Sequence, residues 1–372
     1  MGSLDGDVAP VPQLDSIALG YSGTFTIRRF TRTSESILRV HVLIVGRQRR
    51  IHEGIAQFIS FSDYSLRVQR SRRVSRALLI ALVPSLIIVL AGAGYGFLSL
   101  QDDEPTITEG SFLAGGDRST SVDLPFGYNE NNPAPLLLDL HGFMGDGLSQ
   151  QRFSRLSNVA RENGFVYAAP DGLRNSSGDQ FWNASQSCCN FDRTDIDDAA
   201  FLKSLIDEIS KKVAIDPKRI YIFGHSNGAF MSYKFACTYS DTVAAIVGVA
   251  GAMDLVGNNC AISSPVSVLE IHGTADAVIG FTGGAIAGIS YTSVTQTLDI
   301  WRKLDKCVGA PMPKENIDID ESIDGAETKV FESTCANSTV AHWQIVDGLH
   351  GPAFSATFPK AIIEWLLANP KQ

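Results

Sequence analysis

The sequence predicts a mixed α/β fold with a mostly parallel central sheet flanked by helices. Short apolar runs rich in β-branched residues alternate with stretches whose apolar residues recur at helical spacing. Hydrophobic residues make up 44% of the chain and include 20 Phe, which is ample material for one large core. Alternation of this kind is typical of a parallel sheet covered by helices on both sides.

The predicted strands are apolar along their whole length, as expected of parallel strands that are buried on both faces. In chain order they are Pro135–Leu140, Phe165–Ala169, Ile220–Phe223, Ala244–Val249, Val266–Ile271 and Val340–Val346. The predicted helices are Asp197–Val213, Thr292–Leu304 and Pro359–Ala368, and the Asp-Asp pair at the start of the first suits a helix N-terminus.

A long apolar segment precedes this region. Residues 77–100 contain 24 residues without a charge, enough to cross a bilayer core of roughly 30 Å as a helix. Five Arg lie just before the segment and three acidic residues just after it, so the positive-inside rule places residues 1–76 in the cytoplasm. We expect a signal anchor or, alternatively, a signal peptide cleaved near residues 91–93. The predicted parts are a flexible basic tail (1–76), a transmembrane or signal helix (77–100) and an exported domain (101–372).

The charge and the cysteine content of the chain limit which binding partners and which cellular compartment are expected. Residues 1–76 carry 12 Arg, no Lys and 6 acidic residues, whereas the remainder carries 19 basic and 34 acidic residues, a net charge of −15. Such an acidic body argues against nucleic-acid binding. All six Cys lie in the exported part without zinc-type spacing, and their even number suggests disulfides, with buried free thiols as the alternative. Cys237–Cys260 and Cys307–Cys335 are the expected pairs, while Cys188 and Cys189 could bridge each other or pair elsewhere.

A G-x-S-x-G motif at residues 224–228 points to nucleophilic chemistry. It directly follows the predicted strand Ile220–Phe223 and opens a helical stretch at 229–239, which is the strand–turn–helix context of a nucleophile elbow. The turn is so tight that glycine is required on both sides of Ser226. Its place at a helix N-terminus favours developing negative charge. The motif also occurs by chance, so an ordinary turn serine is the alternative.

A serine nucleophile needs a base, which an acid must orient. In this type of site the partners follow in the order serine, acid, histidine. Asp276 lies on the loop beyond the predicted strand Val266–Ile271, and His350 lies in a glycine-flanked loop between the last strand and the last helix. We therefore expect His350 to be the general base and Asp276 to orient it, with Asp254 as the competing acid.

Backbone N–H groups should stabilise the oxyanion. Asn227, next to the nucleophile, is the expected first donor. The second should come from the glycine-rich loop after the first strong strand, with Phe143 favoured over Met144. On the substrate side we expect Trp182 to line the cleft, unless it is purely structural, and His141 to brace the loop beside the substrate.

Several segments together resemble the secreted feruloyl esterase and polyhydroxybutyrate depolymerase-like group of α/β-hydrolases. The resemblance covers about residues 107–369, and its most diagnostic element is the Trp-Asn…Cys-Cys…Asp-Asp pattern within 181–207. It implies an α/β-hydrolase fold and a triad of Ser226, Asp276 and His350. The segments that carry it are 138–147, 165–172, 181–207, 219–237, 269–284 and 347–352.

The expected activity is that of a serine carboxylic ester hydrolase that works through an acyl-enzyme without a metal or cofactor. The resemblance favours feruloyl-type esters of plant polysaccharide; the alternatives are polyhydroxybutyrate or short-chain aliphatic esters. A serine peptidase and an inactive surface-binding module remain further alternatives. The partner is an ester substrate, and the domain would act outside the cell, either anchored by helix 77–100 or released. The oxyanion loop departs from the group at Phe143 and Met144, where the group often has Cys, Thr or Gly.

Overall fold

The computed structural model describes residues 110–255 and 260–372, together with four two-residue strands in the N-terminal part. The chain divides into two compact units, Met1–Asp103 and Glu104–Gln372. The predicted segment 77–100 lies outside the described residues, and no helix among those described has the length and apolarity to cross a membrane. The short N-terminal strands are β1 (Ala18–Leu19), β2 (Gly23–Thr24), β3 (Leu38–Arg39) and β4 (Ser65–Leu66).

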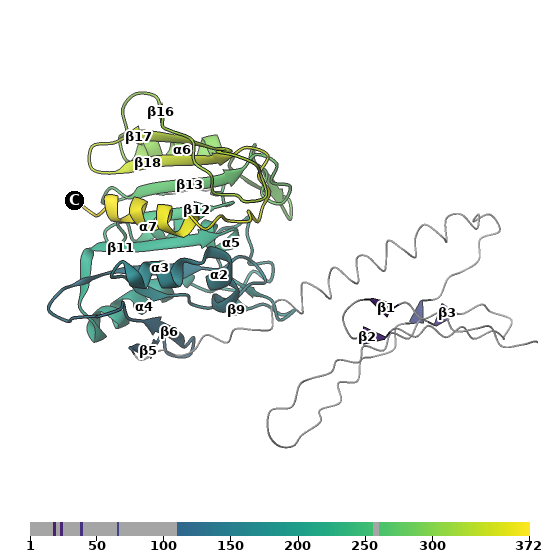
Figure 1. Ribbon diagram of the computed structural model, residues 1–372, viewed down its shortest axis with the longest axis horizontal. Helices are drawn as coiled ribbons and strands as arrows, with labels where there is room; N and C mark the ends of the chain where they lie inside the picture. Colours follow the sequence, from purple (N-terminus) through teal and green to yellow (C-terminus); the bar gives the residue numbers. More distant parts are fainter. Residues whose placement is uncertain (1–17, 20–22, 25–37, 40–64, 67–109, 256–259) are drawn as a thin grey trace, which may run out of the picture. The chain divides into compact units, whose positions relative to one another are not determined.

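The second unit is built on a ten-stranded sheet with the order β16-β17-β18-β13-β12-β11-β7-β8-β6-β5 (Figure 1). The six central strands, from β18 to β8, pair in parallel, and the strands at both edges pair antiparallel. This confirms the predicted mostly parallel sheet. The central strands are β7 (Ala134–Leu140), β8 (Val166–Ala168), β11 (Ile215–His225), β12 (Ala245–Val249), β13 (Ser267–Gly273) and β18 (Thr339–Ile345).

The remaining strands lie at the sheet edges or in two short ribbons. The edge strands are β5 (Ser111–Ala114), β6 (Thr120–Asp123), β16 (Met312–Pro313) and β17 (Thr328–Thr334). The ribbons pair β9 (Leu173–Arg174) with β10 (Gln180–Phe181), and β14 (Gly284–Ile286) with β15 (Ile289–Tyr291).

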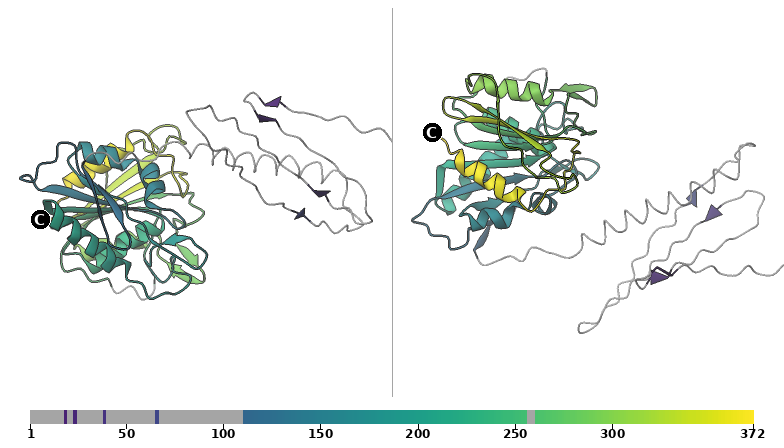
Figure 2. Two further views of the ribbon diagram at one scale, coloured as in Figure 1. Left: turned by 90° about the horizontal axis from the view of Figure 1, so that it is seen from below. Right: turned by 45° about the horizontal axis from the view of Figure 1, so that its top comes forward.

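Helices cover both faces of the sheet (Figure 2). On one face lie α4 (Asp198–Lys212), α5 (Asn227–Thr238) and α6 (Val294–Leu304); on the other lie α2 (Gly147–Ser154), α3 (Leu156–Glu162) and α7 (Phe358–Ala368). The predicted helices correspond to α4, α6 and α7. Helices α2 and α3 were not predicted from the sequence. Helix α2 is mostly polar and begins at a capping box of Asp146 and Ser149.

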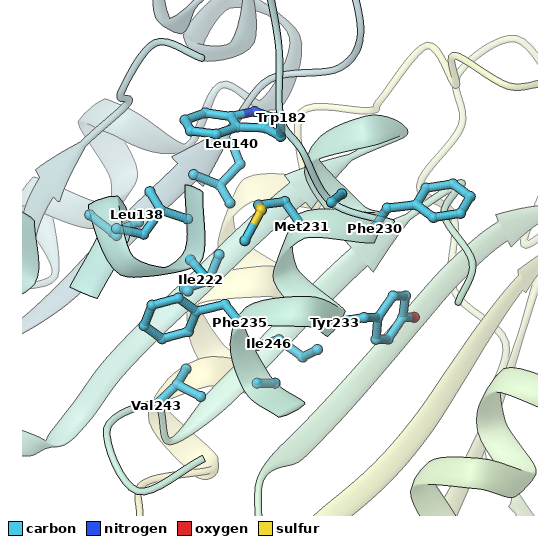
Figure 3. Packing of buried hydrophobic residues seen from close by; sticks show 14 of the residues in the cluster. Leu138, Leu140, Trp182, Ile222, Phe230, Met231, Tyr233, Phe235, Val243 and Ile246 are labelled. Atoms are coloured by element: carbon cyan, nitrogen blue, oxygen red, sulfur yellow. The ribbon is translucent and has the colours of Figure 1, made fainter. Parts of the chain in front are cut away.

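The core therefore has two parts, one on each side of the sheet. Figure 3 shows the α5 side, where Leu138, Leu140 and Ile222 of the sheet face Met231 and Phe235 of the helix. All five side chains are fully buried. Alternate residues of each central strand point into opposite parts of the core. The central strands must therefore be apolar along their whole length.

All six cysteines form disulfides within the second unit. Cys237 bridges to Cys260 and Cys307 to Cys335, as expected, and the adjacent Cys188 and Cys189 bridge each other. The first bridge ties the end of α5 to the loop after β12, and the second ties the loop after α6 to the end of β17.

Candidate active site

Ser226 occupies the sharp turn between β11 and α5. Its backbone is in a left-handed region, with φ 53° and ψ −118°, which a non-glycine residue adopts only under constraint. A Cβ atom on Gly224 would lie 2.2 Å from the Gly228 carbonyl oxygen, and one on Gly228 would lie 2.2 Å from that of Leu140. Both neighbours must therefore be glycine, and the turn presents the Ser226 side chain beyond the end of the strand.

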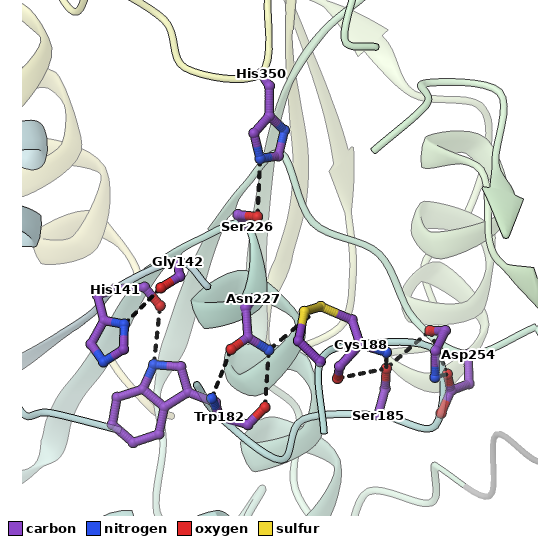
Figure 4. The surroundings of a disulfide bond; sticks show 11 residues. His141, Gly142, Trp182, Ser185, Cys188, Ser226, Asn227, Asp254 and His350 are labelled. Carbon is purple, nitrogen blue, oxygen red and sulfur yellow. Dashed lines mark hydrogen bonds between the residues drawn. A yellow bond between two sulfur atoms is a disulfide. The ribbon is translucent and has the colours of Figure 1, made fainter. Parts of the chain in front are cut away.

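Three side chains distant in sequence form one hydrogen-bonded chain. His350 Nε2 lies 3.0 Å from Ser226 Oγ, and His350 Nδ1 lies 2.8 Å from Asp276 Oδ2. Figure 4 shows the Ser226–His350 contact. Ser226 is 9% exposed and Asp276 is 6% exposed. The ends of β11, β13 and β18 thus bring together the residues that chain order predicted as nucleophile, acid and base.

Both oxygens of the Asp276 carboxylate form hydrogen bonds. Its Oδ1 accepts hydrogen bonds from the backbone N–H groups of Val278 (2.8 Å) and Ile279 (2.9 Å). Burial alone would raise the pKa of Asp276, but hydrogen bonds from His272 and His350 and the backbone hold it well below its ordinary value. Asp276 is therefore ionised and can orient the His350 ring.

Asp254, the competing acid, does not reach His350. Its carboxylate accepts from the backbone N–H groups of Gln186 and Ser187 and from the Ser187 hydroxyl, at 2.7 to 3.0 Å. Asp254 thus anchors the loop that carries the Cys188–Cys189 bridge. Throughout residues 110–255 and 260–372, side chains able to ligate a metal form no cluster of three or more.

His225 supports the loop of His350. Its Nε2 lies 3.0 Å from the carbonyl oxygen of His350, and its ring packs against Phe153 with ring centroids 4.3 Å apart. Burial lowers the pKa of His225 to about 4, so the ring is neutral at neutral pH. It can then donate from Nε2 to the carbonyl oxygen.

The sequence predicts the backbone N–H groups of Asn227 and Phe143 as oxyanion donors, and their hydrogen bonding bears on that prediction. Asn227 is the first residue of α5, where the N–H has no partner within the helix. In the loop after β7, the Met144 N–H donates to the Gln180 carbonyl at 2.9 Å, so it is occupied. Within the described part of the chain, the Phe143 N–H has no such acceptor. This geometry favours Phe143 over Met144 as the second donor.

Trp182 and His141 are both buried, at 0% and 1% exposure, which supports the structural alternative for Trp182 and the bracing role of His141 over a contact with substrate. Trp182 Nε1 donates to the His141 carbonyl (3.0 Å), and the Trp182 backbone exchanges hydrogen bonds with the Asn227 side chain (Figure 4). His141 Nδ1 lies 2.7 Å from the Gly142 carbonyl, and Nε2 accepts from the Gly172 N–H at 2.8 Å. The two residues instead lock the oxyanion loop to α5.

A set of partly or largely exposed apolar side chains beside the site was not predicted from the sequence. We call it the apolar rim, and it consists of Phe143, Met144, Phe191, Val278 and Leu349. Phe143 packs edge-on against Phe191, with ring centroids 5.3 Å apart. Met144, Leu349 and Val278 are 68%, 62% and 61% exposed, and each lies within two residues of Phe143, His350 or Asp276. The sequence could have indicated these residues, because each of these three lies next to or two positions from a predicted site residue. Exposed apolar groups gathered around a nucleophile are suited to an apolar ligand.

Several known proteins with similar sequences are esterases. A family model described as Phospholipase/Carboxylesterase matches residues 182–305. Feruloyl esterase B of Piromyces equi is 32% identical over 221 residues, which cover 56% of this chain and 40% of that protein. Feruloyl esterase D of Neurospora crassa is 24% identical over 292 residues, which cover 74% and 88%.

The chain thus spans only two fifths of the Piromyces protein. Among solved structures, an acetyl xylan esterase from Aspergillus awamori shares the fold, with a TM-score of 0.51 and 15% identity over 69% of this chain and 97% of that one. The sheet order, the elbow and these matches lead to one assignment. The chain has the α/β-hydrolase fold and is similar in sequence to carboxylic ester hydrolases.

Proposed function

We propose that this protein is a serine carboxylic ester hydrolase, with Ser226 as nucleophile, His350 as general base and Asp276 as the orienting acid. The observation that carries the proposal is the continuous hydrogen-bonded chain from Ser226 Oγ through His350 to Asp276. The ionised Asp276 accepts from Nδ1 and so leaves Nε2 of a neutral His350 free to take the serine proton.

The reaction follows from this arrangement in two halves. As Ser226 Oγ attacks the ester carbonyl carbon, its proton passes to His350 Nε2. The resulting oxyanion accepts hydrogen bonds from the N–H groups of Asn227 and Phe143. His350 then returns the proton to the departing alcohol oxygen, leaving an acyl-serine. Water then attacks the acyl carbon and gives a proton to His350. The second tetrahedral intermediate collapses, His350 returns that proton to Ser226 Oγ, and the carboxylic acid is released.

The apolar rim supports an aromatic acyl group. The edge-on pair of Phe143 and Phe191 offers ring surface beside the oxyanion loop, and aromatic pairs of this kind add about 0.5–1.5 kcal/mol beyond area burial. We therefore propose feruloyl-type esters of plant polysaccharide as substrates, in line with the names of the relatives. The exposed aliphatic part of the rim (Met144, Val278 and Leu349) favours polyhydroxybutyrate or short aliphatic esters as the second candidate.

We further propose that the catalytic domain, predicted as residues 101–372, acts outside the cell. Three disulfides support an oxidising compartment, where such bonds persist. The apparent mass of the mature protein in membrane and medium fractions tests whether the predicted segment 77–100 stays as an anchor or is removed.

The test of the proposed activity compares hydrolysis of methyl ferulate and p-nitrophenyl butyrate by the purified protein and by Ser226→Ala. We expect activity on at least one ester and its loss, by a factor of about 10⁴ or more, in Ser226→Ala. The ratio of kcat/KM for the two esters chooses between aromatic and aliphatic acyl groups. A folded protein inactive on both esters, or an active Ser226→Ala, would contradict the proposal and favour a peptidase or a binding module.

A further inference from the structure

A second chain of buried side chains reaches Asp276 from the interior of the protein. The Tyr233 hydroxyl donates to Glu270 Oε2, and Glu270 Oε1 lies 2.8 Å from His272 Nδ1. His272 Nε2 in turn lies 3.3 Å from Asp276 Oδ2. Glu270 and His272 are 0% and 1% exposed. A buried ionic pair seldom stabilises a fold more than apolar residues of the same size, so stability does not explain it.

Both ring nitrogens of His272 face oxygen atoms, and burial raises the pKa of Glu270 while hydrogen bonds from His272 and Tyr233 oppose that rise. Nε2 lies 2.8 Å from the Ile279 carbonyl oxygen, which can only accept. Nδ1 faces Glu270, whose other oxygen accepts from the Tyr233 hydroxyl. Burial alone would lower the pKa of His272, but hydrogen bonds to Asp276 and Glu270 raise it to about 9. His272 is therefore an imidazolium at neutral pH.

We propose that Glu270 and His272 are positioning residues of the triad: Glu270 keeps His272 charged, and His272 holds Oδ2 of Asp276 beside His350. The inference rests on the proposed function. With both oxygens of Asp276 occupied, the carboxylate cannot turn away from His350 Nδ1. The positive charge of His272 also offsets part of the Asp276 charge that acts on His350. Removing the charge of His272 should therefore strengthen the attraction between Asp276 and a proton on His350.

The other titratable groups nearby do not supply this charge. Tyr233 of α5 and His342 of β18 pack near His272, and His225 packs near His350. Burial lowers the pKa values of His342 and His225 to about 4, so both rings are neutral at neutral pH. Among the groups that face the triad histidine and its acid, His272 is thus the one that carries a positive charge.

The test measures how fast a fluorophosphonate labels the purified full-length protein between about pH 4.5 and 9. This probe modifies an activated serine whatever ester is the natural substrate. In His272→Gln we expect the midpoint of the acid limb to move up by about one pH unit, because an opposite or like charge nearby shifts a pKa by 1–3 units. His342→Gln is the matched control: it makes the same change in the neighbouring strand and should leave the midpoint unchanged.

Glu270→Gln tests the coupling between the two residues. Without its carboxylate partner, His272 becomes neutral in the buried site, so the midpoint should again move up. The double variant should move it no further than either single change, since both remove the same charge. A downward shift in Glu270→Gln, or shifts that add in the double variant, would overturn the inference.

The remaining outcomes separate the inference from the proposed function. A His272→Gln protein that labels more slowly at every pH, with the wild-type midpoint, has only a structural defect and overturns the positioning role. A folded wild type that is not labelled at any pH contradicts the proposed serine chemistry itself. If His272→Gln does not fold, Tyr233→Phe removes a single hydroxyl from Glu270, and we expect a smaller upward shift; an unchanged midpoint there would count against the inference.

Discussion

The side-chain amide of Asn227 is clamped to the backbone of Trp182 by two hydrogen bonds. Asn227 Oδ1 accepts from the Trp182 N–H at 2.7 Å, and Nδ2 donates to the Trp182 carbonyl at 3.0 Å. Trp182 in turn donates from its indole to the His141 carbonyl. One buried network thus connects the first residue of α5 with the loop that carries Phe143, so the two proposed oxyanion donors are held in fixed relation.

We predict that Asn227→Ala keeps its backbone N–H but loses this alignment. The buried Trp182 N–H and carbonyl lose their partners, which costs about 1–3 kcal/mol of unfolding free energy. We expect kcat to fall by about 10-fold or more with KM little changed, measured with p-nitrophenyl butyrate beside urea unfolding. The exposed Asn131→Ala is the control, and an Asn227→Ala protein with wild-type kcat would show that the clamp does not align the donors.

The apolar rim gives a second prediction, on acyl selectivity. Phe191→Ala removes the ring that packs edge-on against Phe143, so kcat/KM for methyl ferulate should fall by about 5–10-fold. The value for p-nitrophenyl butyrate should change less, since a short aliphatic chain has no ring to stack.

The control for this change is Phe126→Ala. Phe126 is also exposed, at 57%, but it lies in the loop after β6, where it packs under the guanidinium of Arg161 from α3. Equal losses on both esters in Phe191→Ala would indicate a general role for the ring and remove the support for an aromatic acyl group.

Much of this arrangement could be predicted from the sequence because it depends on local pattern. Continuous apolar runs predicted the central strands, and the glycines at 224 and 228 predicted the elbow. His350 and Asp276 were predicted because chain order and strand ends determine where loops meet in a parallel sheet. The polar helix α2 was missed because its boundary depends on a cap and its position on tertiary packing.

Trp182 and Phe191 differ in burial in a way that the local sequence pattern does not predict. Both are aromatic residues of one loop, yet Trp182 is buried and Phe191 is 48% exposed. The difference arises from partners distant in sequence, since the indole donates to the His141 carbonyl and the Phe191 ring contacts Phe143. No sequence rule applied to the loop alone distinguishes the two, so Trp182 was expected to line the cleft and Phe191 was not singled out.

The Cys237–Cys260 bridge should contribute substantially to stability. It closes a loop with a sequence separation of 23, for which the chain-entropy relation gives about 3 kcal/mol. We predict that the double variant Cys237→Ser, Cys260→Ser lowers the unfolding free energy by about 2–4 kcal/mol in urea at neutral pH. Its labelling by a fluorophosphonate at low temperature should stay near the wild-type rate, because neither cysteine contacts the triad. Unchanged stability would mean that the bridge does not constrain the unfolded chain.

A final prediction concerns Asp139, which lies fully buried in β7. Its carboxylate accepts hydrogen bonds from Gln150, Ser154 and Tyr167 at 2.5 to 2.7 Å, but burial outweighs them and raises its pKa from 3.8 to about 6. A raised folded-state pKa means that the native protein binds a proton more tightly than the unfolded chain does. The stability from this group is complete below about pH 4 and is lost as the pH rises through about 6.

We therefore predict that wild-type stability falls relative to Asp139→Asn as the pH rises from 4 to 7. With about 1.4 kcal/mol for each unit of pKa shift, the change in the difference should reach about 3 kcal/mol. Urea unfolding of both proteins at several pH values measures it, and taking the difference removes the contribution of every other titrating group. The exposed Asp117→Asn, measured in the same way, should differ from the wild type by a nearly constant amount. A constant difference for Asp139→Asn would instead mean that the three hydrogen bonds compensate for burial and that Asp139 is ionised throughout.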